Sequence, residues 1–334
     1  MKAAVHHRFG APDVVTVDDV PKPVPRDDEV LVQVHAATLG VVDGLARRGT
    51  PFYARFHFGL RRPRFAVLGA DFAGQIQAIG PAVTRFAVGD PVFGTIAPRF
   101  GAHAEYVCLS ERAAVAPKPV NLSYAEAAAL VDATALCFLR DKANLQRGQS
   151  VLINGASGAV GTTAVQLARH FGATVTGVCS GANTGLVRTL GAEIVVDYTE
   201  ADFTRAGQAY DVIFDVAGKS SFTRCRPALS RAGVYLTTAP SLAILLQMPW
   251  TSRFSARKAV VAFTGLRAAD QKRKDLLYIS ELAEASALTP VIDACYPLRR
   301  IADAHRHVEE GRKKGTVIIT MTDLAPPAFR PLSG

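Results

Sequence analysis

Apolar and polar residues follow two different spacings along this chain. Residues 1–122 are rich in Val, Pro and Gly and contain short alternating runs, such as residues 29–35, which predict β-strands joined by turns. Residues 124–267 instead alternate apolar runs with helical periodicity, which favours a parallel, doubly wound sheet. We expect helices at 159–171 and 183–190 and strands at 151–154, 173–178, 194–197, 211–214, 233–237 and 259–263.

The flanks of this central stretch carry their own signals. Ser123 and Glu126 have the spacing of a capping box, which predicts a helix running into residues 127–130. After residue 268 the pattern predicts helices at 276–285 and about 300–310, and a strand at 317–319. Residues 325–334 are expected to form a loose tail.

A glycine-rich turn joins the first central strand to its helix. Its spacing, G-x-x-G-x-x-G, follows an apolar strand and opens a helix, which is the context of a dinucleotide site. The first glycine permits the turn, the second lets backbone approach a pyrophosphate, and the third packs the helix on the strand. A tight turn without a ligand is the alternative. The predicted cofactor contacts are Gly155, Ala156, Ser157, Gly158, Ala159, Val160 and Gly161.

The end of the next strand bears on which nucleotide binds. An NAD site would usually place Asp or Glu about 20 residues beyond the glycines. The chain has Cys179-Ser180-Gly181 at this point, which leaves room for a 2′-phosphate and supplies no repelling carboxylate. This favours NADPH over NADH, with an NAD enzyme using other contacts as the alternative. The strand at 211–214 leads to Val216-Ala217-Gly218, where ligands bind in such sheets.

Composition excludes several classes of protein. Of 334 residues, 49% are hydrophobic and 20% charged, as in a globular protein. The N-terminus has no apolar signal-peptide core, and no apolar run approaches the length of a membrane span. The five cysteines form no C-x-x-C pair, which indicates reduced thiols. We therefore expect a cytoplasmic protein without a disulfide framework.

The formal net charge of +9 has two interpretations. A basic cleft would attract a polyanionic cofactor, and a basic stripe would bind nucleic acid. The basic clusters at 61–64 and 312–314 are short, and no nucleic-acid-binding motif accompanies them. We interpret the charge as mainly solvated surface, with a share facing the cofactor.

The ordered motifs resemble the medium-chain dehydrogenase/reductase superfamily, in its zinc-independent quinone-oxidoreductase and enoyl-reductase-like branch, over roughly residues 1–322. The resemblance implies a GroES-like catalytic domain (1–123 and 268–334), a Rossmann NADP-binding domain (124–267), and a cleft between them that binds NADPH. The motifs are LGADFAG (68–74), VTRFAVGDPVF (83–93), AEYV (104–107), NGASGAVG (154–161), LGA (190–192), VDY (196–198), FDVAG (214–218) and GTVI (315–318).

Zinc alcohol dehydrogenases of this superfamily offer a Cys, a Gly-His-Glu and a later Cys as ligands. The corresponding stretches here are Gly40-Val41-Val42-Asp43 and Gly69-Ala70-Asp71, which supply neither thiolate nor imidazole. We therefore expect no metal site. Without a metal, hydride transfer to an activated enone or a quinone needs less help than reduction of a simple ketone.

The sequence offers three candidates near the reacting atoms, and two of them, Asp43 and Tyr53, come from the resemblance. Asp43 matches a family Asp, with bracing of its loop as the alternative. Tyr53 lies near where related enoyl reductases place a tyrosine, with a packed aromatic side chain as the alternative. Asp132 stands at the predicted cleft edge, facing either substrate or solvent. Solvent remains a possible proton source, because Gly40 stands where the family often has Asn.

The resemblance also extends the cofactor site. Thr134 matches a Thr near the nicotinamide ribose, and Thr238 lies in a loop expected to meet the nicotinamide. Ser180 and Tyr198 match residues around the 2′-phosphate. Asn183 lies where relatives often have a basic residue, and the basic cluster at 312–314 could compensate.

Residues 242–250 form an apolar run that could wall a substrate pocket, join the core or contact a second copy. The strand at 259–263 would lie at a sheet edge, and such edges need covering. In this family that edge commonly pairs with a second copy, so we expect a homodimer.

Taken together, the sequence predicts an NADPH-dependent, metal-free reductase of apolar enones or quinones. One alternative is an NAD(P)-dependent ketone reductase or alcohol dehydrogenase. The other is a non-catalytic NADPH-binding sensor or nucleic-acid binder.

Overall fold

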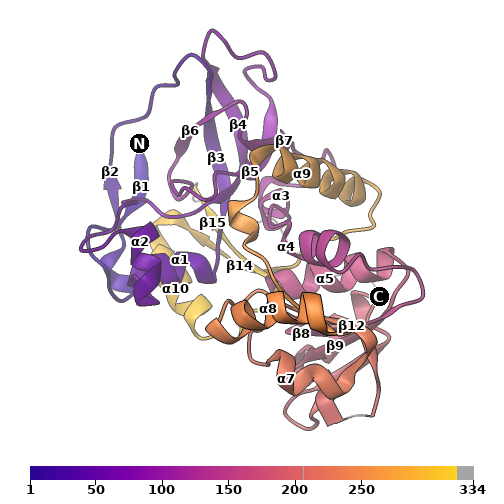
Figure 1. Ribbon diagram of the computed structural model, residues 1–334. Coiled ribbons are helices and arrows are strands. Elements are labelled where there is room, and N and C mark those ends of the chain that lie inside the picture. Colours follow the sequence, from indigo (N-terminus) through magenta and orange to yellow (C-terminus); the bar gives the residue numbers. More distant parts are fainter. Residues whose placement is uncertain (206, 322–334) are drawn as a thin grey trace. The chain divides into compact units, whose positions relative to one another are not determined.

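The computed structural model describes residues 1–205 and 207–321, which form two compact units (Figure 1). The first unit comprises Met1–Asp132, Gly265–Ser286 and the described residues from Pro290 onward. The second comprises Ala133–Thr264 with Ala287–Thr289. The tail expected at 325–334 lies outside the described residues.

The first unit is built on a largely antiparallel sheet. Its strand order is β14-β15-β3-β4-β5-β7, with β6 also paired to β3 and a separate β1-β2 pair. β14 and β15 run parallel, and the other neighbours run antiparallel. The strands are β1 (Lys2–Val5), β2 (Thr16–Asp19), β3 (Glu29–Leu39), β4 (Asp71–Ile79), β5 (Pro91–Thr95), β6 (Tyr106–Ser110), β7 (Ala114–Pro117), β14 (Ile292–Pro297) and β15 (Thr316–Thr320).

The helices of this unit include one whose start the sequence specifies. Ser123 Oγ accepts a hydrogen bond from the Glu126 N–H, and a Glu126 oxygen accepts one from the Ser123 N–H, which confirms the predicted capping box. α9 begins seven residues before the predicted start at 276, because its first turns are polar and carry no apolar period. The helices are α1 (Val41–Arg48), α2 (Arg55–Phe58), α3 (Tyr124–Ala129), α9 (Ala269–Glu284) and α10 (Ile301–Glu309).

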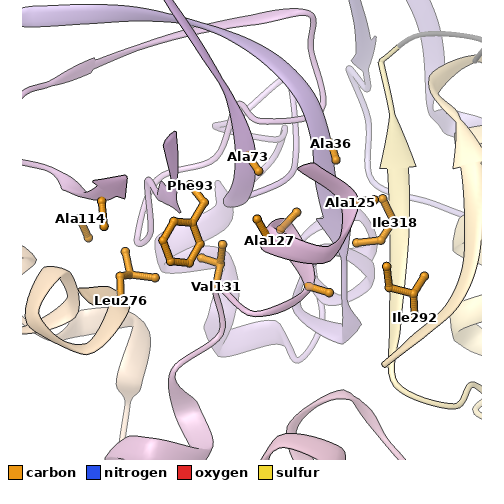
Figure 2. Packing of buried hydrophobic residues seen from close by; sticks show 13 residues of the cluster. Ala36, Ala73, Phe93, Ala114, Ala125, Ala127, Val131, Leu276, Ile292 and Ile318 are labelled. Carbon is orange, nitrogen blue, oxygen red and sulfur yellow. The ribbon is translucent and has the colours of Figure 1, made fainter. Parts of the chain in front are cut away.

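An alanine-rich helix joins the sheet to α9 in the core of the first unit. Figure 2 shows the ring of Phe93 from β5 between Leu276 of α9 on one side and Ala127 of α3 with Val131, just beyond that helix, on the other. The small side chains of α3 allow its backbone to approach the sheet closely. Phe93 has no exposed surface, so it fills the largest share of this space.

The second unit contains one sheet in which every pair of neighbouring strands is parallel. The strand order is β10-β9-β8-β11-β12-β13, so the chain starts in the middle and winds outward in both directions. This confirms the predicted doubly wound sheet. The elements are β8 (Ser150–Asn154), β9 (Thr174–Cys179), β10 (Ile194–Asp197), β11 (Tyr210–Asp215), β12 (Leu229–Thr237), β13 (Lys258–Val261), α4 (Thr134–Leu136), α5 (Ala159–His170), α6 (Thr184–Thr189), α7 (Phe222–Cys225) and α8 (Leu242–Phe254).

The apolar run at 242–250 forms most of helix α8. Ser241 caps its start by accepting a hydrogen bond from the Ile244 N–H at 3.3 Å, and Pro249 lies inside the helix. No helical period is visible in this stretch of sequence, because apolar residues occur on all sides of the helix.

Phe93→Ala should destabilise the first unit by about 3–5 kcal/mol, because it removes a buried ring and leaves a cavity between α3 and α9. Urea denaturation followed by circular dichroism would measure this change. Val24→Ala, at a side chain that is 83% exposed, is the matched control and should shift the midpoint little. A Phe93 variant as stable as the parent would contradict this account of the core.

Candidate active site

The glycine turn between β8 and α5 is held by the neighbouring strand. The N–H groups of Gly155 and Ala156 both donate to the carbonyl oxygen of Val178 in β9, at 3.0 Å. Gly155 has a φ of 93°, a conformation that side chains other than glycine rarely adopt. The turn therefore has one fixed path out of the sheet.

The other two glycines of the turn have different surroundings. A Cβ at Gly161 would lie 2.0 Å from the carbonyl oxygen of Gly155, so the helix can pack on the turn only without a side chain there. A Cβ at Gly158 would meet only that same oxygen, at an ordinary 3.6 Å, and Gly158 has an unstrained φ of −80°. The protein itself therefore does not require glycine at 158.

Helix α5 begins without a side-chain cap. Its N-cap is Gly158, which has no side chain to bond the first N–H groups of the helix. Twelve residues of aligned peptide dipoles end at this point. The start of α5 is thus a place where an anion is favoured.

A buried carboxyl group, Asp215, links the ends of three neighbouring strands. It has no exposed surface and accepts hydrogen bonds from Asn154 Nδ2 (2.8 Å) and Tyr235 Oη (3.0 Å). It also accepts from the N–H groups of Gly218 (3.0 Å) and Ser220 (2.9 Å), so it shapes the loop after β11. Burial and the neighbouring Asp215 raise the pKa of Tyr235, which keeps this phenol a donor. In the sequence, Asp215 stands out only as part of the motif FDVAG (214–218).

The predicted contacts on the following loops are tied to this framework. The N–H groups of Val216 and Ala217 donate to the carbonyl oxygen of Asn154, at 3.0 and 3.1 Å. Thr238 Oγ1 donates to the carbonyl oxygen of Val216 at 3.2 Å, which joins the loops after β11 and β12. Thr134 Oγ1 lies 3.0 Å from Thr264 Oγ1, beyond the edge strand.

Asn183 connects the glycine turn to the end of β9. Its Nδ2 donates to Ser157 Oγ (3.1 Å) and to Ser180 Oγ (3.2 Å), which leaves both hydroxyl protons available for another acceptor. Asn183 is 8% exposed, and its Oδ1 is buried without a hydrogen-bond partner in the described residues. A buried, unsatisfied oxygen is the expected mark of a site that a ligand or water completes.

The expectation that no carboxylate lies near this point needs correction. Asp197, the last residue of β10, accepts a backbone hydrogen bond from Gly181, and hydrogen bonds from Thr199 lower its pKa, so it is charged. The pattern along β9 does not reveal this acid, because Asp197 belongs to the adjacent parallel strand β10. Tyr198, beside it, is 61% exposed.

Asp43 lies in the first unit and is almost fully buried. Its two oxygens accept hydrogen bonds from the N–H groups of Gly40 (2.8 Å) and Gly69 (3.0 Å). These bonds match the loop-bracing alternative. For Tyr53 the structure describes the backbone, in the short 3-10 turn Phe52–Ala54, and its side chain lies outside the described part.

Asp71, at the start of β4, is the residue that sequence reasoning missed as a candidate. Loss of hydration raises its pKa to about 7, and the Asp132 carboxyl group acts in the same direction. A hydrogen bond with Thr95 opposes the rise, Asp43 adds to it, and Lys272 opposes it. The first unit thus brings Asp43, Asp71 and Asp132 into electrostatic contact. Only the position of Asp71 in the motif LGAD hinted at this.

Lys272 of α9 is 8% exposed, and its Nζ donates to the carbonyl oxygens of Ala97 (2.8 Å) and Gly265 (2.6 Å). Burial lowers its pKa. Lys313, in the basic cluster at 312–314, donates to the Gly315 carbonyl oxygen at 2.8 Å. Burial lowers the pKa of Lys313, and the Asp293 and Asp132 carboxyl groups oppose this fall. These contacts place Lys313 in its own unit's charge network.

The described residues contain neither a metal-ligand cluster nor a membrane-spanning helix. No group of three or more His, Cys, Asp or Glu among them could hold a metal ion. No helix within residues 1–205 and 207–321 is long and apolar enough to span a bilayer.

Two family models match the chain. Residues 26–120 match the alcohol dehydrogenase GroES-like domain, and residues 190–319 match a model described as zinc-binding dehydrogenase. The first of these supports the GroES-like fold of the first unit.

Full-length relatives extend the match. The chain is 31% identical to a chloroplastic quinone-oxidoreductase homolog of Spinacia oleracea over 93% of this chain and 95% of the relative. It is 31% identical to a chloroplastic NADPH-dependent alkenal/one oxidoreductase of Arabidopsis thaliana, over 96% and 79%. The structure of the quinone oxidoreductase from Coxiella burnetii superposes with a TM-score of 0.85 at 29% identity, covering 96% of this chain and 99% of that one. The chain therefore belongs to the medium-chain dehydrogenase/reductase superfamily, in its quinone-oxidoreductase and enoyl-reductase-like branch.

Proposed function

We propose that this protein is an NADPH-dependent oxidoreductase that transfers hydride to an α,β-unsaturated carbonyl or a quinone. The observation that carries the proposal is the uncapped start of α5 behind Gly158, a position that the protein's own packing leaves open. The names of the relatives, quinone oxidoreductase and NADPH-dependent alkenal/one oxidoreductase, support the substrate class and the cofactor.

The residues present fit the proposed cofactor. Backbone N–H groups at residues 159–161 would bind the pyrophosphate, as at other uncapped helix starts. Ser157 and Ser180 would hold the 2′-phosphate through their two available hydroxyl protons, and Asn183 would position both serines. Tyr198 would flank that end, and Thr134, Thr238 and residues 216–218 would contact the nicotinamide end. When bound, NADPH supplies the hydride.

The expected carbonyl chemistry follows from the side chains at the two stretches where zinc alcohol dehydrogenases have their metal ligands. The stretches 40–43 and 69–71 offer the carboxylates Asp43 and Asp71 and neither thiolate nor imidazole, so they do not fit a catalytic zinc. We infer a metal-independent reaction on an already activated acceptor. Product analysis separates it from the alternative, because an enone reductase yields a saturated ketone and a ketone reductase yields an alcohol.

Asp71 is our candidate for the group that supplies the proton. With a pKa of about 7 it exchanges protons near neutral pH, as a general acid must. Asp43 would position it, because Asp43 bonds the Gly69 N–H in the segment leading to Asp71. Asp132 would tune it through its charge, and Tyr53 remains a proposed donor.

Assembly and location stay predictions. β13 is an edge strand of its sheet, so we propose a homodimer in which this edge pairs with a second copy. We keep the cytoplasm as the proposed location, although relatives named above are chloroplastic. Nucleic-acid binding is the less favoured role.

Gly158→Asp should abolish NADPH binding and keep the fold, because only a bound pyrophosphate would conflict with the new carboxylate. Gly161→Ala should instead destabilise the protein, since its Cβ would meet the Gly155 carbonyl oxygen at 2.0 Å. Fluorescence titration with NADPH and thermal melting would separate the two effects. Unchanged NADPH affinity in a folded Gly158→Asp variant would exclude the proposed site.

Asp197→Asn should raise the preference for NADPH over NADH by about fivefold, because removing one negative charge near the 2′-phosphate gains about 1 kcal/mol. Asn keeps the size of the side chain and can still accept the Thr199 hydrogen bonds. The measurement is the ratio of the two dissociation constants, at low and high salt. An unaltered ratio would place the 2′-phosphate away from Gly181.

Asp71→Asn should reduce turnover by about 100-fold, the usual contribution of a general acid. In the parent enzyme kcat/KM should fall as pH rises through about 7, because the protonated form of Asp71 is required and is lost above its pKa. The variant should lose this descending limb. A variant that keeps both the parental rate and the parental pH profile would remove Asp71 from the reaction.

A further inference from the structure

Helix α8 of the second unit (labelled in Figure 1) carries a row of exposed apolar side chains. Residues spaced four apart along the helix lie on this face, and their side chains are 75%, 65%, 53% and 69% exposed. They are, in order, Leu242, Leu246, Trp250 and Phe254, and Leu245 extends the face at 42% exposure. We call these five side chains the α8 face.

The opposite side of α8 fixes the helix to its unit. Ile244 and Thr251 are buried there, and Thr251 Oγ1 accepts a hydrogen bond from the Ala259 N–H of β13 at 3.1 Å. Lys258 Nζ donates to the carbonyl oxygens of Thr251 (3.1 Å) and Ser252 (2.9 Å), near the end of the helix. The contacts that hold α8 on its unit therefore involve other side chains and leave the α8 face exposed.

The chain around α8 carries positive charge only. Residues 216–264 contain seven Lys or Arg residues and no Asp or Glu. Arg253 belongs to α8 itself and is exposed, and Arg257 and Lys258 follow directly after its end. Arg257 Nε donates to the Leu229 and Ser230 carbonyl oxygens, which brings the exposed Arg231 to the same region. Cations thus gather near the C-terminal end of α8.

We propose that the α8 face docks onto the surface of an anionic lipid bilayer. A short helix that shows Leu, Trp and Phe to solvent beside cations has the composition of an interfacial anchor. With 13 residues it is about 20 Å long, too short to cross a bilayer, and would lie in the plane of the headgroups. Trp250, in the middle of the face, would sit at the headgroup level that tryptophan favours.

Charge distinguishes this occupant from a second copy of the chain. A two-fold contact through the α8 face would bring Arg253 and its neighbours toward their own equivalents, and residues 216–264 offer no acid to pair with them. Anionic headgroups supply the missing negative charge. The inference concerns this surface alone and does not depend on which reaction the protein catalyses.

The chain carries its own reporter, because Trp250 is its single tryptophan. Vesicles of phosphatidylcholine and phosphatidylglycerol in equal parts should shift its emission to shorter wavelength, and acyl-chain-brominated lipid should quench it. The same vesicles should carry the protein upward in a flotation gradient. Vesicles of phosphatidylcholine alone should bind about tenfold more weakly, since the cations then gain no attraction.

Two variants test the face and its charge separately. Leu246→Gln with Phe254→Gln keeps the reporter and should weaken binding to anionic vesicles by at least about tenfold. Arg253→Glu should weaken it by about tenfold and reduce its sensitivity to salt. The matched control, Val24→Gln with Val120→Gln, alters two side chains exposed by 83% and 86% elsewhere and should bind like the parent.

Two results would overturn the proposal. One is the absence of flotation and of any Trp250 shift with the anionic vesicles. The other is Trp250 emission that is already at short wavelength without lipid and moves to longer wavelength on dilution, while vesicles leave it unchanged. The second result would identify a second copy of the chain as the occupant of the α8 face.

Discussion

The second unit depends on one buried carboxyl group. Asp215 takes a donor from β8, a donor from β12 and two backbone N–H groups from the loop that follows its own strand. A buried carboxyl group without such partners would cost several kcal/mol, so the three strand ends must keep their relative positions for the group to stay satisfied. This edge of the sheet is where the glycine turn leaves β8, so the same bonds position the proposed cofactor contacts.

The three glycines of the turn illustrate how structural and functional requirements separate. Gly155 is required by its positive φ, and Gly161 by the close approach of α5 to the turn. Neither requirement applies at position 158, because Gly158 has an ordinary φ and there is space for a Cβ beside it. Its lack of a side chain is therefore explained best by a ligand, which makes it the most informative residue of the turn.

One aspartate in each unit shows how the surroundings set the pKa of a carboxyl group. In the first unit, Asp71 shares its surroundings with two other carboxyl groups and a buried lysine, and loss of hydration moves its pKa into the neutral range. In the second unit, Asp197 remains charged because Thr199 and Gly181 bond it. The pKa values of these two aspartates thus shift in opposite directions, because Asp71 loses its hydration whereas Asp197 is stabilised as a carboxylate by hydrogen bonds.

The sequence by itself determined the element types, the parallel sheet, the capping box at Ser123 and the glycine turn. These features rest on local signals: apolar spacing, side-chain caps and glycine positions act over a few neighbouring residues. The family motifs added the GroES-like fold and the nicotinamide cofactor. The apolar run that became α8 escaped this reasoning, because a helix with apolar residues on every side has no period to detect.

Only the tertiary structure decided which distant residues meet. Asp197 reaches Gly181 because β9 and β10 are parallel neighbours, and their separation in sequence conceals this. The pKa of Asp71 likewise depends on β4, α9 and the segment that ends at Asp132, which come together only on folding. Hydration and charge are properties of the assembled surroundings, so no pattern along the chain could have assigned them.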